Sequence, residues 1–424
     1  MIKFYIKGLL RDKQRSVLPV IIVTIGVMLT VLMQCYVTGV MGDMIRFNAN
    51  FSTGHVKIMT RAYMENQSQI PNDLAILGVN ELMDKVKKDF PDVKWVERIQ
   101  FGGLIDVADE NGETLTQGPG FGIAVELISG NSGEIERLNL EKALIKGRFP
   151  EKSNEVLISE EFAEKLEVAP GGSITLIGST MYGSMSITNF EVAGTVKFGI
   201  SALDRSGIVA DISGIRQALD MEDACGEILG FQAGLNYNDE LATSIADKFN
   251  TAYTDASDEF SPQMVTLRQN NNIGGMLEMM ELFKPVIVNI FVVIMAIVLW
   301  NAGLLGGLRR YGEIGLRLAI GEQKSHIYRS MISESVIIGF VGSAFGTIFG
   351  LFFAYLLQEY GLDVSGMMKD TTMIMPGVYR AQILPSSYYI GLVPGILATV
   401  IGTGLSGIGI FKRKTASLFK ELEA

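Results

Sequence analysis

Four long runs of apolar residues interrupt an otherwise mixed pattern of polar and apolar positions. Val17–Val40, Pro285–Leu308 and Ala381–Phe411 contain no Asp, Glu, Lys or Arg, and Ser330–Gln358 contains one, Glu334. A helix needs roughly 20 residues to cross a hydrocarbon layer of ~30 Å, so each run is long enough to span a membrane. The pattern therefore predicts four transmembrane helices.

The segment between the first two runs has the texture of a folded α+β domain. Short β-branched stretches predict strands at 56–59, 104–107, 123–128, 155–159, 173–177, 186–198 and 207–212. Helical periodicity predicts helices at 80–90, with Asn80 as N-cap, and at 160–166, 213–221 and 239–249. Because strands crowd residues 126–212, we expect a β-rich subdomain inserted within a mixed α/β one.

The distribution of basic residues predicts the orientation. They cluster before the first run, between the second and third, and after the last: Lys3, Lys7, Arg11, Lys13, Arg15; Arg309, Arg310, Arg317, Lys324, Arg329; Lys412, Arg413, Lys414, Lys420. The positive-inside rule puts these segments in the cytoplasm and residues 41–282 outside. Residues 41–282 carry 19 basic and 37 acidic residues, which argues against nucleic acid as a partner.

Residues 1–16 alternate apolar and basic positions at helical spacing. This pattern fits an amphipathic helix in the cytoplasmic headgroup layer, before the chain turns inward at Pro19. A plain basic flank that only sets topology is the alternative.

Candidate chemistry is sparse. The run Gly118-Pro-Gly-Phe-Gly122 is glycine-rich, but Pro119 lacks a phosphate-binding amide, so a tight turn between strands is the better interpretation. No GxxxxGK[ST] phosphate loop, metal-spaced His/Cys/carboxylate cluster or nucleophile elbow occurs in the sequence. We therefore expect no metal site and no enzymatic activity on this chain.

Glycines recur every fourth residue in the last three apolar runs. They are Gly303 and Gly307; Gly342, Gly346 and Gly350; Gly391 and Gly395. Small residues at this spacing let membrane helices approach closely, so we expect these faces to pack on each other or on a second subunit. Chance enrichment of glycine is the alternative. Pro394 should kink the last span, and Glu334 should pair with a loop arginine or face a conduit.

The order of one span, a large outer domain and three more spans resembles the FtsX/MacB-type permeases of ABC transporters. The matching residues after span two are Asn301, Glu313-Ile314-Gly315, Ala319, Gly321, Ile327 and Glu334. Residues 154–211 are similar to the family's MacB-like periplasmic core, and the resemblance covers essentially the whole chain. The layout is most similar to the LolC/LolE lipoprotein-releasing permeases. Glu322 departs from the pattern, because the family usually has alanine there.

The resemblance implies a fold class and an order of parts. The fold is an α-helical membrane protein with four transmembrane helices and a large α+β extracytoplasmic domain, a MacB-like core with an inserted β-rich subdomain. The expected order is cytoplasmic helix 1–16, span 17–40, outer domain 41–282 (β-rich part about 126–212), span 283–308, cytoplasmic coupling loop 309–330, span 331–357, outer loop 358–384, span 385–411 and cytoplasmic tail 412–424.

The resemblance also implies partners. A separate ABC ATPase dimer, holding ATP and Mg, would bind the 309–330 loop, and a second permease subunit would complete the membrane part. The residues expected to couple to the ATPase are Glu313, Ile314, Gly315, Arg317, Ala319, Gly321 and His326.

Three functions remain open at this stage. The first is extraction of a lipoprotein from the inner membrane and its release to a periplasmic carrier. The second is MacB-like efflux with an adaptor and an outer-membrane channel, and the third is FtsX-like control of a cell-wall hydrolase. All three place the chain in the inner membrane with both termini in the cytoplasm, and fold analogy alone does not choose among them.

Overall fold

A computed structural model describes residues 13–109, 112–199, 201–232, 237–270, 274–308, 311–364 and 378–412. The chain divides into two compact units. The helical unit comprises Met1–Gly42, Met279–Leu362 and Tyr379–Ala424, and the sheet unit comprises Asp43–Glu278 and Asp363–Val378. Residues 1–12 of the expected interfacial helix 1–16 lie outside the described residues, as do most of the expected cytoplasmic tail 412–424 and residues 365–377 of the expected outer loop 358–384.

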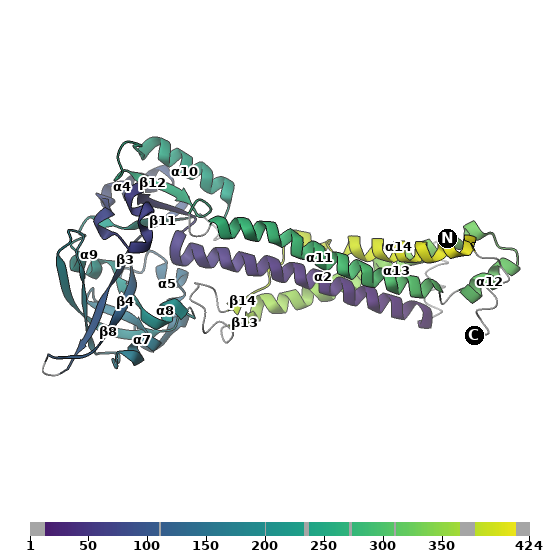
Figure 1. Cartoon of the computed structure of the whole chain (residues 1–424), viewed down its shortest axis with the longest axis horizontal. Coiled ribbons are helices and arrows are strands. Elements are labelled where there is room, and N and C mark those ends of the chain that lie inside the picture. The colour runs from purple at the N-terminus through teal and green to yellow at the C-terminus, as the bar shows by residue number, and fades with distance from the viewer. Residues whose placement is uncertain are drawn as a thin grey trace. The chain divides into compact units, whose positions relative to one another are not determined.

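The helical unit is built from long helices (Figure 1). They are α2 (Lys13–Asn48), α11 (Gly274–Leu308), α13 (Lys324–Tyr360) and α14 (Leu392–Lys412), with the short α12 (Tyr311–Ala319) between α11 and α13. Four helices in the described part of the chain are long and apolar enough to cross a membrane, as the sequence predicts. Short pieces precede α14: β13 (Leu362–Asp363), β14 (Val378–Tyr379) and η5 (Pro385–Tyr388).

One proline behaves differently from expectation. Pro19 lies inside α2, which is already helical at Lys13, so the chain does not turn there. Pro394 is the third residue of α14 and lies in its first turn. Proline is tolerated in the first turn of a helix because amide groups there have no intrahelical acceptor.

Helix α13 packs closely on α2 through its glycine face. A Cβ atom added at Gly342, Gly346 or Gly350 would lie 2.7–2.8 Å from the Cβ of a valine on α2. The facing valines, which are also four residues apart, are Val23, Val27 and Val31. Gly391, just before α14, and Gly395 within it approach two of these valines, Val27 and Val31. Gly303 and Gly307 lie in α11, but their surroundings fall outside the described side chains.

The sheet unit contains a ten-stranded sheet in its described part, in the order β12-β1-β11-β3-β4-β9-β6-β8-β5, with β7 pairing to β3 and β8. The strands are β1 (Val56–Thr60), β3 (Val93–Ala108), β4 (Thr114–Val125), β5 (Leu144–Gly147), β6 (Glu155–Ser159), β7 (Ser173–Ser179), β8 (Met185–Val196), β9 (Gly207–Asp211), β11 (Glu227–Gln232) and β12 (Pro262–Thr266). A separate pair joins β2 (Ile76–Leu77) and β10 (Ala224–Cys225).

Strand β3 joins the two halves of this unit. Residues 93–98 pair with β11, and residues 99–108 pair with β4. The strand-rich block at 126–212 therefore continues the same sheet through β3 and β4 instead of standing apart from it.

Helices cover the sheet, and their apolar faces form its core. They are α3 (Arg61–Glu65), α4 (Val79–Asp89), α5 (Glu134–Arg137), α6 (Leu140–Ala143), α7 (Glu160–Lys165), α8 (Ser201–Ser206), α9 (Ile212–Leu219) and α10 (Asp239–Tyr253). A π-helical turn, η1 (Ala49–Thr53), follows α2, and two 3-10 turns, η2 (Gln67–Gln69) and η3 (Asn72–Leu74), follow α3. The largest cluster of buried side chains joins residues of β1, β3, β6, α7, α9 and α10.

Most predicted strands and helices of this unit are present, but two predictions are wrong. Residues 118–122 are not a turn; they lie inside β4 and pair with β3. Glycine is needed there because a Cβ at Gly122 would lie 2.2 Å from the Phe101 ring. Pro119 is tolerated because β4 pairs on its other side with β9 only from Phe121 onward. The N-cap of α4 is Gly78 and not Asn80.

Candidate functional site

The segment that the sequence singles out forms a tight corner between α12 and α13. Helix α12 ends at Ala319, and the amides of Ile320, Gly321 and Glu322 bond back to its last carbonyls. Gly321 has φ +99°, a conformation that residues with a Cβ rarely adopt. Three residues later, at Lys324, α13 begins, with Gln323 as its N-cap. We call residues 311–331 the α12–α13 corner.

A small apolar cluster holds the two helices of the corner together. Ile314 from α12 packs against Ile327 and Met331 from α13, and all three side chains are buried. Leu318, one turn further along α12, covers the cluster from the side. Because 314 and 318, like 327 and 331, are four residues apart, each pair lies on one helix face. The start of α13 and α12 are therefore packed against each other through this cluster.

An ionic bridge fastens the corner across Gly321. The Nε and Nη2 atoms of Arg317 each donate to a different oxygen of Glu322 at 2.7 Å, and His326 Nδ1 lies 2.6 Å from Glu322 Oε1. These bonds lower the pKa of Glu322 to about 2; the hydrogen bond from Arg317 is the largest cause and that with His326 the second. The carboxylate therefore stays ionised at physiological pH, where it can accept both bonds from Arg317.

The side of α12 that does not pack on α13 exposes an apolar ridge. Leu316 is 53% exposed, Ile320 is 78% exposed, and Ala319 between them is exposed as well. An exposed apolar ridge on a charged, short helix is typical of a protein contact surface. We call Leu316, Ala319 and Ile320 the corner ridge.

The residues expected to couple to the ATPase lie in different structural settings. Ile314 and Gly315 are buried within the corner, Arg317 and His326 both hold Glu322, and Gly321 makes the bend. Ala319 is exposed on the ridge. Glu313 lies in α12, but its side chain falls outside the description.

Sequence reasoning missed Leu316, Ile320 and Glu322 as site residues. The signal for Glu322 was present, since it departs from the family pattern next to the bend glycine. The corner ridge could not be found from helical periodicity, because α12 is apolar on two faces. The pattern does not tell that Leu316 and Ile320 are exposed while Ile314 and Leu318 pack on α13.

The described residues offer no metal site. Among them, no group of three or more His, Cys, Asp or Glu side chains is placed to hold a metal ion.

Comparison with known proteins decides the family. The model of the MacB-like periplasmic core domain matches residues 16–235, and that of the FtsX-like permease C-terminal domain matches residues 285–415. The chain belongs to the FtsX/MacB-type permease family. Both matched regions include membrane helices, so the permease is a membrane protein with four candidate spans and a large α/β domain.

Two kinds of curated relatives resemble the permease. The macrolide export ATP-binding/permease protein MacB of Mannheimia succiniciproducens is 23% identical over 54% of this chain and 37% of its own length. The lipoprotein-releasing system transmembrane protein LolC of Xylella fastidiosa is 21% identical over 54% of this chain and 55% of its own length. The permease thus spans about a third to a half of these relatives.

A solved structure is also similar to part of the permease. The periplasmic region of MacB from Actinobacillus actinomycetemcomitans matches with a TM-score of 0.35 at 13% identity. The match covers 53% of this chain and 94% of that structure.

Proposed function

We propose that this permease is the transmembrane subunit of an ATP-driven ABC transporter. A separate ATPase dimer binds ATP and Mg and docks on the α12–α13 corner, which lies in the cytoplasm with both chain termini. The observation that carries this proposal is the corner ridge. It offers exposed apolar side chains for a partner on a helix that a buried cluster fastens to α13.

The proposed mechanism is mechanical. The ATPase subunits move the ridge as they close on ATP. The Ile314–Ile327 contact and the Glu322 bridge pass this displacement to α13. At three glycines of α13, no glycine side chain separates this helix from α2. Helix α2 therefore moves together with α13. Helix α2 runs on into η1, which belongs to the sheet unit, so the chain itself carries the motion to the outer domain.

For the cargo, we propose a lipoprotein that is extracted from the inner membrane and released to a periplasmic carrier. The similarity to LolC supports this version. We also propose that a second permease subunit pairs with this one. Export of a small compound through an adaptor and an outer channel is the second candidate, and the similarity to MacB favours it.

Purification from native membranes tests the docking step. Wild-type permease should bring an ABC ATPase with it, and Ile320→Asp should lose that ATPase because a carboxylate replaces the most exposed ridge side chain. Ile187→Asp is the matched control, since Ile187 is similarly exposed but lies on β8. Equal ATPase recovery with Ile320→Asp and wild type would refute docking on the ridge.

Reconstitution into proteoliposomes tests the cargo. A lipoprotein should stimulate ATP hydrolysis by the complex and appear in the supernatant when a soluble carrier is present. Stimulation by small amphiphilic compounds alone, without lipoprotein release, would favour the efflux function instead.

A further inference from the structure

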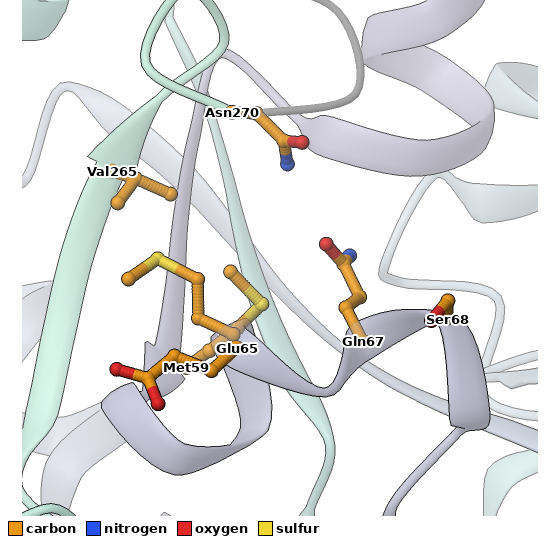
Figure 2. A pocket seen from close by; sticks show the side chains of 7 residues that line it. Met59, Glu65, Gln67, Ser68, Val265 and Asn270 are labelled. Carbon is orange, nitrogen blue, oxygen red and sulfur yellow. The ribbon is translucent and has the colours of Figure 1, made fainter.

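The sheet unit contains a small cavity beside the C-terminal end of β1 (Figure 2). Its volume is about 140 Å³. Met59, Met64 and Val265 form an apolar wall, and the side chains of Gln67 and Asn270 point into it from two other sides. Glu65 and Ser68 are exposed at the rim, which leaves the cavity open to solvent.

A buried ion pair determines the orientation of the Gln67 amide. Gln67 Nε2 donates to Glu227 Oε1 at 3.0 Å, and Lys57 Nζ donates to the same oxygen at 2.9 Å. Lys57 and Glu227 are both almost fully buried. An ionised carboxylate only accepts hydrogen bonds, so the amide nitrogen of Gln67 must face it and the amide oxygen must face away.

The amide oxygen of Gln67 therefore points toward the methionine wall (Figure 2). Within the described part of the chain, no group donates a hydrogen bond to this oxygen. The cavity thus has a fixed acceptor on one side and two polarisable thioethers on another.

The backbone that carries Gln67 is held under strain. Ile70 closes the η2 turn with φ 52°, a left-handed conformation that a β-branched residue rarely adopts. Such conformations persist where the surrounding structure enforces them, and they are common at binding sites. Ile70 directly follows the Gln67–Gln69 turn, which carries Gln67 beside the cavity.

The size and chemistry of the cavity select a class of ligand. An apolar cavity of about 150 Å³ is large enough to bind benzene. Methionine sulfur makes favourable contacts with aromatic rings. About four or five water molecules, at about 30 Å³ each, would fill the same volume, and a bound ring would displace those that lie against the apolar wall. An aromatic ring that also donates one hydrogen bond would contact the methionine side chains and bond to the amide oxygen of Gln67.

We infer that this cavity binds a single aromatic ring bearing one hydrogen-bond donor, of the phenol or indole class. The ring lies against Met59 and Met64, and its O–H or N–H donates to Gln67 Oε1. This inference is independent of the proposed transport function.

Methionine methyl NMR of the full-length permease in detergent tests the inference. The protein is labelled with ¹³C-methyl methionine, and the two signals are assigned with Met59→Leu and Met64→Leu. Phenol and indole should shift both signals saturably. Val265→Phe, which fills the cavity, should abolish the shifts. Absence of saturable shifts at both methionines in the wild type overturns the inference.

The role of the acceptor is tested by Gln67→Leu, with toluene as the ligand without a donor. Loss of one neutral hydrogen bond should weaken phenol binding roughly two- to tenfold, while toluene binding stays unchanged. Equal effects on phenol and toluene would overturn the role of Gln67 Oε1. Thermal unfolding of the variant confirms that it is folded.

A third ligand distinguishes the source of the ring. N-Acetyltyrosinamide carries the phenol ring on a peptide-like backbone. Its binding identifies the occupant as an aromatic side chain of a polypeptide, and its exclusion while phenol binds identifies a free small molecule. Both outcomes support the site.

Discussion

Charge reversal across the α12–α13 corner tests whether the corner moves as one unit. Arg317→Glu places a second carboxylate against Glu322, and Glu322→Arg places a second guanidinium against Arg317. Either change replaces two hydrogen bonds of 2.7 Å by repulsion. The double exchange restores opposite charges at the same two positions. We expect each single variant to loosen the corner and the double variant to recover.

The structure sets the size of this effect. The two side chains are 33% and 26% exposed, so solvent screens the pair. Exposed pairs contribute about 0.2–1 kcal/mol, and two parallel charge-assisted bonds put this one near the upper end. About 1 kcal/mol corresponds to roughly a fivefold change in an equilibrium constant. Each single variant should therefore bind the ATPase subunit about fivefold more weakly, and the effect should shrink in high salt.

The pH dependence follows from the pKa of Glu322. It is lowered from 4.5 to about 2, so the folded state holds the carboxylate in its charged form. A depressed carboxyl pKa contributes its full stabilisation above the ordinary value of 4.5 and loses it as the pH falls toward 2. The contribution of this bridge to ATPase affinity should therefore be constant between pH 8 and pH 5, so the Glu322 carboxyl adds no pH dependence over that range.

The assay measures the dissociation constant between the full-length permease in nanodiscs and its co-purifying ATPase, at low and high salt. Lys146→Glu is the matched control, because it reverses the charge of another exposed ion pair, Lys146–Glu160, in the sheet unit. Wild-type affinity in either single variant, or a double variant no tighter than the singles, would refute the bridge as a fastening of the corner.

Three further outcomes test the packing and the buried charges. Lys57→Met leaves the Glu227 carboxylate buried without its cation and should cost about 3–5 kcal/mol in chemical unfolding of the permease; a loss under 1 kcal/mol would contradict this. Gly346→Leu should lower the thermal midpoint in detergent, because its Cβ would lie 2.7 Å from Thr24 O, whereas Gly404→Ala should be tolerated at 3.4 Å. Glu155, whose pKa is lowered to about 2 chiefly by its arginine partner, should stabilise the sheet unit above pH 4.5 and lose that contribution toward pH 2, and Glu155→Gln should flatten this acid dependence of unfolding.

Much of the sheet unit was predictable from local pattern. The prediction for β6 matches at both ends, and those for β1, β7, β9 and α7 come within a residue or two. These elements have β-branched runs or helical periodicity bounded by turn residues. Strands β11 and β12 were not predicted.

The glycine run in β4 shows where local reasoning fails. Glycine and proline at 118–122 indicate a turn when only neighbours in sequence are considered. In the fold, large side chains from β3 occupy the space above these glycines, including Phe101 and Ile105. The reason for the glycines therefore lies in a strand about twenty residues away.

The amino-acid sequence by itself determined the class of this protein. Four long apolar runs, the placement of basic residues and the motif after the second run were enough to predict the spans, the large outer domain and the family. These features are visible in sequence because membrane thickness and helix geometry act on consecutive residues.

Only the tertiary structure decided which residues of the motif face a partner. Ile314, Leu316, Leu318 and Ile320 are alike in sequence, yet packing on α13 buries the first, partly covers the third and leaves the other two exposed. The orientation of Gln67 likewise depends on a carboxylate 160 residues away. Burial and hydrogen bonding between distant segments are properties of the packed chain, so no local pattern reports them.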